Sequence, residues 1–209
     1  DIRKSSTLSS RMEAVRALRA ASPRAATKKL ATRPAEFGEI RQPNTDYLAV
    51  PLHTSEVREY VPMAWFTPDV ITNNAVAIVG QADITLFGVL QSRPFNVWNK
   101  AVSGRIKSDT RISSTITYNN FPFPQLNDVL RDKIAAAAKS VLEARDSYPN
   151  SSLVDLYESR SMPAELSKAH TKLDAEVISA YGLKSSATDA EILEVLFGMY
   201  AQQVAVTGK

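Results

Sequence analysis

The spacing of apolar residues changes at Phe121–Pro124, and this change constrains the fold more than any other feature. Between Tyr47 and Val79 the apolar runs are short and are broken by Pro, Asn and Gly, which is typical of strands with tight connections. Beyond Pro124 the apolar side chains recur at helical spacing, which favours helices packed on one another: Leu126, Leu130, Ile134, Ala137, Val141 and Tyr148. We therefore predict an α+β chain, with a mixed α/β domain at 1–122 followed by a small all-helical domain at 123–209.

Capping residues and prolines indicate where the helices begin and end. Residues 9–22 have an apolar stripe among arginines, and Pro23 ends this basic amphipathic helix. The helical pattern at 82–103 contains Pro94, so the helix is expected to kink or to start afresh there. Further helices are predicted at 125–147, 152–159, 163–181 and 189–205.

Charge divides the chain in the same way. Residues 1–122 carry 16 Lys and Arg against 10 Asp and Glu, a net charge of +6, whereas residues 123–209 carry 9 against 12, a net charge of −3. A basic half joined to a mildly acidic half indicates a domain that faces a polyanion. The alternative is a solvated charged helix. The side chains expected to contact phosphates are Arg24, Lys28, Lys29 and Arg33.

The residue inventory excludes several kinds of site. No stretch approaches the roughly 18 consecutive apolar residues of a membrane span, and the chain has no Cys, which fits a reducing cytoplasm. His170 is expected to be a satisfied core or interhelix residue and His53 a loop residue, so neither favours catalysis or a metal site. A Gly-rich phosphate loop and the Asn-Pro-Pro-Tyr type of motif used by amino-methyltransferases are also absent. We therefore expect no catalytic centre, metal or cofactor in this chain, which starts at Asp1 and is interpreted as a piece of a longer protein.

One polar segment, GRIKSDTR at residues 104–111, has the side chains of a base-reading element. If the segment is extended, four side chains alternate onto one side: Arg105, Lys107, Asp109 and Arg111. Arg and Lys donate to guanine O6 and N7, and Asp accepts from cytosine N4, so Lys107 with Asp109 could read both halves of one G·C pair. The alternative is a surface ion pair that contributes little.

Three segments resemble one family in the order expected. Residues 87–126 read FGVLQSRPFNVWNKAVSGRIKSDTRISSTITYNNFPFPQL and resemble the core of the target recognition domain of the MmeI-like type IIL restriction-modification enzymes. Residues 30–63, which read LATRPAEFGEIRQPNTDYLAVPLHTSEVREYVPM, fit the same domain. Residues 151–182, which read SSLVDLYESRSMPAELSKAHTKLDAEVISAYG, resemble the helical domain that ends those proteins.

The resemblance implies a longer parent chain and a set of DNA contacts. The parent would carry an amino-terminal nuclease, with Mg²⁺ for cleavage, and an adenine-methylating domain that uses S-adenosylmethionine. The polar residues of the 105–111 loop would read bases. A second set of candidate base readers, less strongly indicated, is Asn73, Asn74 and Ala75. Arg58 matches a basic position of the family and would contact phosphate or hold its loop. The chain departs from the pattern at Thr110 and Ile112, where aromatic residues are usual.

These observations together predict a bacterial, cytoplasmic DNA-recognition fragment whose partners are double-stranded DNA and the remainder of its own chain. Arg and Lys side chains would hold phosphates while the 105–111 side chains select bases in the major groove. The aromatic residues of Tyr118–Phe123 are expected to pin the link between the two domains rather than to stack on a base. The rival interpretation is a protein-interaction module in which the acidic helical half docks a partner subunit.

Overall fold

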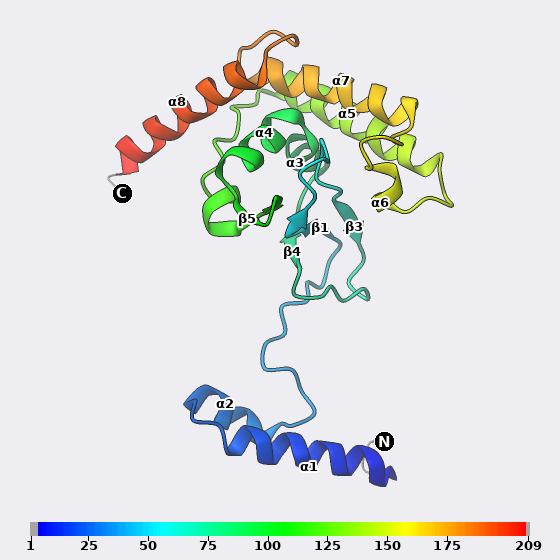
Figure 1. The fold of residues 1–209 in the computed structure, drawn as a ribbon, viewed down its shortest axis with the longest axis vertical. Coiled ribbons are helices and arrows are strands. Elements are labelled where there is room, and N and C mark those ends of the chain that lie inside the picture. Colours follow the sequence, from blue (N-terminus) through cyan, green and yellow to red (C-terminus); the bar gives the residue numbers. More distant parts are fainter. Residues whose placement is uncertain (1–3, 208–209) are drawn as a thin grey trace. The chain divides into compact units, whose positions relative to one another are not determined.

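The computed structural model describes residues 4–207, which divide into two compact units, Asp1–Gln42 and Pro43–Lys209 (Figure 1). The boundary that the sequence predicts near residue 122 falls inside the second unit and stays a prediction. None of the described helices is long and apolar enough to cross a membrane.

The first unit is built from a long helix and a short one. Helix α1 (Ser6–Ala20) is capped by the Ser5 side chain, and α2 (Ala25–Lys29) leads into a 3₁₀ turn at Leu30–Thr32. The basic helix predicted at 9–22 is therefore confirmed, and it ends before Pro23 as expected.

Arg19 holds this first unit together. Its guanidinium donates to three backbone carbonyl oxygens, those of Leu30 at 3.1 Å, Arg33 at 2.8 Å and Glu36 at 2.9 Å. No residue of α1, α2 or the 3₁₀ turn is buried, so the unit depends on these bonds more than on a hydrophobic core.

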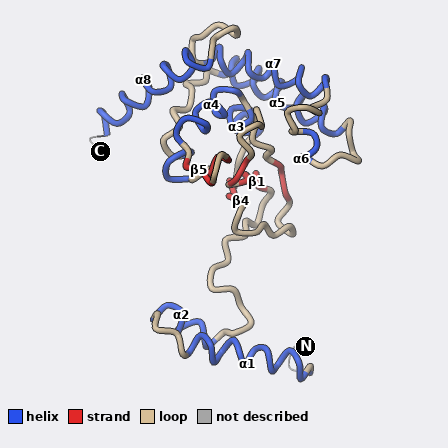
Figure 2. Tube along the Cα trace, viewed as in Figure 1, coloured by secondary structure: helices blue, strands red, loops and turns tan. Residues whose placement is uncertain are grey.

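The second unit begins with strands, as predicted for 47–79, and strands are drawn red in Figure 2. Together with two later strands they form two small antiparallel sheets. In the first sheet, β1 (Tyr47–Pro51) lies between β3 (Ala64–Phe66) and β4 (Val76–Gly80). In the second sheet, β6 (Asp109–Arg111) lies between β2 (His53–Thr54) and β5 (Gly104–Ile106). Because β1 and β2 follow each other directly in the chain, one segment contributes to both sheets.

Helices supply the rest of the second unit. The helical pattern at 82–103 forms two helices, α3 (Ile84–Gln91) and α4 (Arg93–Val102), and Pro94 lies in the first turn of α4, so the predicted fresh start is confirmed. The four helices predicted after Pro124 are also present: α5 (Asp128–Asp146), α6 (Leu153–Leu156), α7 (Ala164–Ala180) and α8 (Asp189–Thr207).

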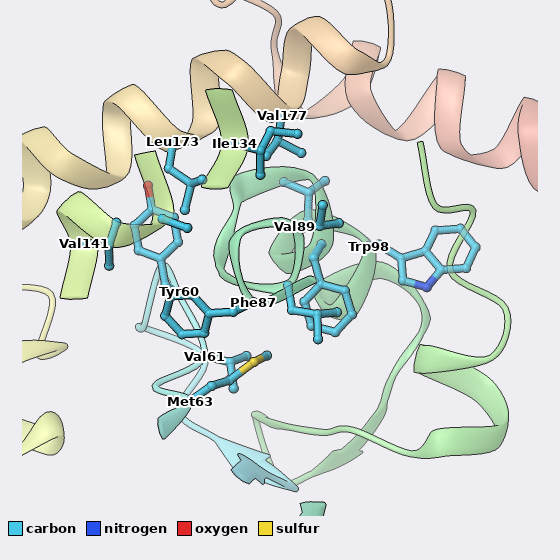
Figure 3. Packing of buried hydrophobic residues seen from close by; sticks show 14 of the residues in the cluster. Tyr60, Val61, Met63, Phe87, Val89, Trp98, Ile134, Val141, Leu173 and Val177 are labelled. Atoms are coloured by element: carbon cyan, nitrogen blue, oxygen red, sulfur yellow. The ribbon is translucent and has the colours of Figure 1, made fainter. Parts of the chain in front are cut away.

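One hydrophobic core joins the strands to the carboxy-terminal helices (Figure 3). Helix α3 lies at its centre, where Gly88 lets α5 approach closely. A Cβ atom on Gly88 would lie 2.8 Å from Ile134 Cγ2 and 3.1 Å from Ala138 Cβ, both on α5. Met63, which precedes β3, and Leu173, which lies on α7, are both fully buried in this core.

The aromatic residues before Pro124 pack on one another and on the rings of α4. Phe121 is buried, and its ring lies 5.2 Å from that of Phe95, 6.2 Å from that of Trp98 and 4.9 Å from that of Phe123. These edge-to-face contacts fix the segment between α4 and α5. The rings thus pack on one another as predicted, whereas a link between two domains at this segment stays a prediction.

Candidate nucleic-acid interface

Residues 104–111 form a β-hairpin rather than one extended strand. Strands β5 and β6 pair antiparallel, and Lys107 and Ser108 make the two-residue turn between them. Lys107 has a φ of 56°, the left-handed conformation that such tight turns require. The premise that this segment is extended throughout is therefore wrong.

The hairpin register separates the predicted base readers onto two faces. Gly104 pairs with Arg111 and Ile106 with Asp109, so these four residues share one face, because cross-strand partners point to the same side. Arg105 pairs with Thr110 and shares the opposite face. All four predicted readers are exposed, but only Asp109 and Arg111 lie together, with Lys107 in the turn beside them. The expectation that Arg105 lies beside them is wrong.

Strand β2 adds a histidine to the face of Asp109 and Arg111. His53 pairs with Arg111 and is exposed, so it lies on that face and not in a loop as expected. The two-residue strand is too short for its sequence pattern to show. The alternation of exposed His53 with buried Thr54 is visible only in the structure, so no signal in the sequence indicates this strand.

Leu52 links the second predicted set to the residue that follows the hairpin. The Leu52 N–H donates to the carbonyl oxygen of Ala75 at 2.9 Å, and the Ile112 N–H donates to the carbonyl oxygen of Leu52 at 2.8 Å. Asn73 and Asn74 are exposed just before Ala75, and the Asn73 side chain accepts from the Ala75 N–H at 2.8 Å. The fold therefore brings together the two sets that the sequence places more than 25 residues apart.

Two side-chain contacts anchor the hairpin to its surroundings. Asp109 Oδ1 accepts from the Glu56 N–H at 3.3 Å, which joins β6 to the turn that follows β2. Arg105 donates to the carbonyl oxygens of Ser108 at 2.8 Å and Lys100 at 3.0 Å, which joins the hairpin turn to the end of α4. Each anchor uses a charged side chain that the sequence assigns to base reading.

Arg58 lies in the loop between β2 and β3. Its N–H donates to the carbonyl oxygen of Ser55 at 3.1 Å, which closes the turn. The side chain is half-buried, and among residues 4–207 its buried Nε has no hydrogen-bond partner. The backbone bond agrees with the predicted support of the loop, and the phosphate contact of Arg58 stays a prediction.

A buried hydrogen-bond network supports the end of that loop. The guanidinium of Arg145 on α5 donates to the Tyr157 hydroxyl at 2.9 Å, to the Met63 carbonyl at 2.8 Å and to Gln91 Oε1 at 2.7 Å. The Tyr157 hydroxyl also lies 2.7 Å from Nε2 of His170 on α7. His170 is fully buried, so the predicted core position is confirmed. It is only half satisfied, because among the described residues its buried Nδ1 has no hydrogen-bond partner.

Tyr60 ties the same loop to α7 directly. Its ring stacks on that of His170 with centroids 3.9 Å apart, and its hydroxyl donates to Asp174 Oδ2 at 2.7 Å. The Val61 N–H donates to Asn96 Oδ1 on α4 at 2.9 Å. The loop that carries Arg58 is thus attached to the helices at consecutive residues.

The basic side chains of the first unit differ in how free they are. Arg24, Lys28 and Lys29 are exposed and make no ion pair within the described part of the chain. Arg33 pairs with Glu36 at 3.3 Å. Across the described residues, no three His, Cys, Asp or Glu side chains come together in a way that could hold a metal ion.

Comparison with known proteins agrees with this architecture. Residues 1–125 match the family model described as MmeI, target recognition domain, and residues 126–207 match that of MmeI, C-terminal domain. The chain therefore belongs to the MmeI family.

Two relatives give the scale of the similarity. DNA methyltransferase A of Bacillus subtilis (strain 168) is 38% identical over 176 residues, which are 84% of this chain and 20% of that protein. The solved structure of the type IIL restriction-modification enzyme MmeI in complex with DNA is similar with a TM-score of 0.90 and 38% identity, covering 98% of this chain and 27% of that one. The chain thus spans about a quarter or less of the length of these relatives.

Proposed function

We propose that this chain recognises a specific sequence of double-stranded DNA as part of a larger site-specific DNA methyltransferase. The observation that carries the proposal is the exposed hairpin with Lys107, Asp109 and Arg111, which Leu52 links to Ala75 by backbone hydrogen bonds to Ala75 and Ile112. Membership of a family that includes a DNA-bound enzyme supports it.

The proposed mechanism is readout of base edges in the major groove. A two-stranded ribbon fits this groove, where Lys107 and Arg111 would donate to guanine and Asp109 would accept from cytosine. Asn73 and Asn74 carry the side chain that pairs with adenine N6 and N7. Phosphate contacts would come from Arg24, Lys28, Lys29, Arg33 and Arg58.

In this proposal the chemistry belongs to the remainder of the parent protein, in the bacterial cytoplasm. That remainder would bind S-adenosylmethionine, methylate adenine N6 and, with Mg²⁺, cleave DNA. This chain would direct the reaction to its site and contribute no catalytic residue.

Exchanging the charges of the hairpin should change the base preference. Lys107→Asp combined with Asp109→Lys is expected to alter the preferred base pair at one position and to weaken binding of the original site by about 1–3 kcal/mol, because donor and acceptor trade places. The measurement is selection of bound duplexes from a random library, followed by anisotropy titrations.

The matched control exchanges an equivalent pair elsewhere. Lys139→Glu combined with Glu143→Lys on the exposed side of α5 keeps the same net charge and should leave the preference unchanged. An unaltered preference in the Lys107/Asp109 double variant would reject the assignment.

Removing charge from the first unit should weaken binding of all sequences alike. Log K, the logarithm of the DNA-binding constant, falls linearly with the logarithm of the salt concentration, and each phosphate contact contributes about 0.9 to the steepness of this slope. Lys28→Ala combined with Lys29→Ala is therefore expected to make the slope shallower by about 1.8. Salt titrations with the selected duplex and a random duplex measure this slope. If the double variant lost preference at one base position alone, the assignment of Lys28 and Lys29 to phosphate contacts would be contradicted. A wild-type chain that binds neither duplex would favour a protein-docking module instead.

A further inference from the structure

The side chain of Arg105 already binds two main-chain carbonyl groups. Nη1 donates to Ser108 in the hairpin turn at 2.8 Å, and Nη2 donates to Lys100 in the last turn of α4 at 3.0 Å. The planar guanidinium fork suits two acceptors at once, and the carbonyl groups at a helix end have no partner within the helix and carry partial negative charge. One side chain therefore joins the turn to a helix of the core.

The hairpin needs such a link because its own pairing is short. Strands β5 and β6 have three residues each, and β2 contributes two, whereas an isolated two-stranded ribbon is only marginally stable. Thr110 is the buried residue of the hairpin, so little apolar area holds it in place. Lys107, in the turn next to Ser108, depends on whatever fixes that turn.

We infer that Arg105 is a positioning residue, a clamp that sets how the hairpin presents Lys107, Asp109 and Arg111 to DNA, and not a base reader. This inference rests on the proposed function. The register places Arg105 on the face opposite Asp109 and Arg111, and both of its terminal nitrogens already have acceptors. Its loss should blur every base preference that the hairpin sets, because all three readers move together.

The first arm of the test needs no DNA. Arg105→Ala is expected to speed hydrogen–deuterium exchange in peptides covering residues 104–111 by about tenfold, as two hydrogen bonds to the turn and the helix end are lost. Lys100→Ala is the matched control, because it removes a neighbouring positive charge and keeps the carbonyl group that Arg105 binds. Arg105→Lys should recover only part of the protection, since one ammonium group replaces the fork. Unchanged exchange in Arg105→Ala overturns the clamp.

The second arm uses selection from a random duplex library. The alanine variants of Lys107, Asp109 and Arg111 identify the base positions that the hairpin reads, and Arg105→Ala should weaken the preference at all of them. The salt dependence of binding should stay as in the wild type. A preference lost at a single new base position would make Arg105 a base reader. A salt slope of log K that is shallower by about 0.9 would make it a phosphate contact. Either result overturns the inference. A wild-type chain that enriches no sequence rejects the proposed function instead, and the exchange arm then decides on the clamp alone.

Discussion

Replacing Arg145 by alanine is expected to lower the free energy of unfolding by about 3–5 kcal/mol. The guanidinium is buried and donates to the Tyr157 hydroxyl, to Gln91 Oε1 and to the Met63 carbonyl. Its removal leaves these acceptors inside the core without their donor. It also removes the cationic group that lies 5.3 Å from the ring centre of Phe87.

Urea denaturation followed by tryptophan fluorescence reports on the compact unit that contains Arg145, because Trp65 and Trp98 both lie in Pro43–Lys209. Arg131→Ala is the matched control on the same helix. Its ion pair with Asp83 spans 3.6 Å and both side chains are about half exposed, so the expected loss is below about 1 kcal/mol. If Arg145→Ala were no more harmful than this control, the network would not stabilise the loop at Met63.

Local signals account for the parts of the fold that the sequence predicts well. Pro94 starts a helix because its ring fits only the first turn, and Ser152 forms a capping box with Asp155 where the helix of 152–159 is predicted to begin. Each of these decisions involves residues within one helical turn. A single sequence is sufficient for them.

The hairpin was missed because its turn lacks the usual residues. Lys107 adopts a positive φ that Gly, Asn or Asp normally supply, so GRIKSDTR looks like one continuous strand. The register between β5 and β6 decides that Arg105 and Arg111 point to opposite faces of the hairpin, and this register depends on where the chain reverses. The candidate site was located in the sequence, but its arrangement was not.

The shared core was hidden for a different reason. Arg145 and Met63 are 82 residues apart, and neither residue's neighbours indicate the other. The hydrophobic pattern divides the chain at Pro124, yet α5 packs directly on α3 through Gly88. Only the assembled structure reveals that the strands and the carboxy-terminal helices share one core.

Two buried side chains on α7, His170 and Asp174, are expected to make the free energy of unfolding depend on pH in opposite directions. Burial, reinforced by the charge of Arg145, lowers the pKa of His170 from 6.5 to about 3. Burial also raises the pKa of Asp174 from 3.8 to about 6, although hydrogen bonds from the Tyr60 hydroxyl and the Arg93 N–H oppose it. The two side chains are one helical turn apart, and Tyr60 contacts both.

The directions follow from which state binds the proton. Unfolded His170 takes up a proton near pH 6.5 but folded His170 does not, so its contribution is complete above pH 6.5 and is lost at about 1.4 kcal/mol per unit as the pH falls toward 3. Folded Asp174 keeps its proton to about pH 6, whereas the unfolded chain releases it near 3.8. Its contribution is therefore complete below pH 3.8 and decreases by about 3 kcal/mol as the pH rises to 6. In the wild type the two dependences nearly cancel between pH 4 and 6.

Single variants should uncover each dependence. Between pH 7 and 4.5, the stability deficit of His170→Gln relative to the wild type is expected to shrink by about 3 kcal/mol, and that of Asp174→Asn is expected to grow by about 2 kcal/mol. Urea denaturation of all three proteins at both pH values measures this, and comparison at each pH removes the common contribution of the exposed carboxylates. Two deficits that change in the same direction would show that burial does not separate the two pKa values. The coupling of α7 to the loop between β2 and β3 would then need another physical basis.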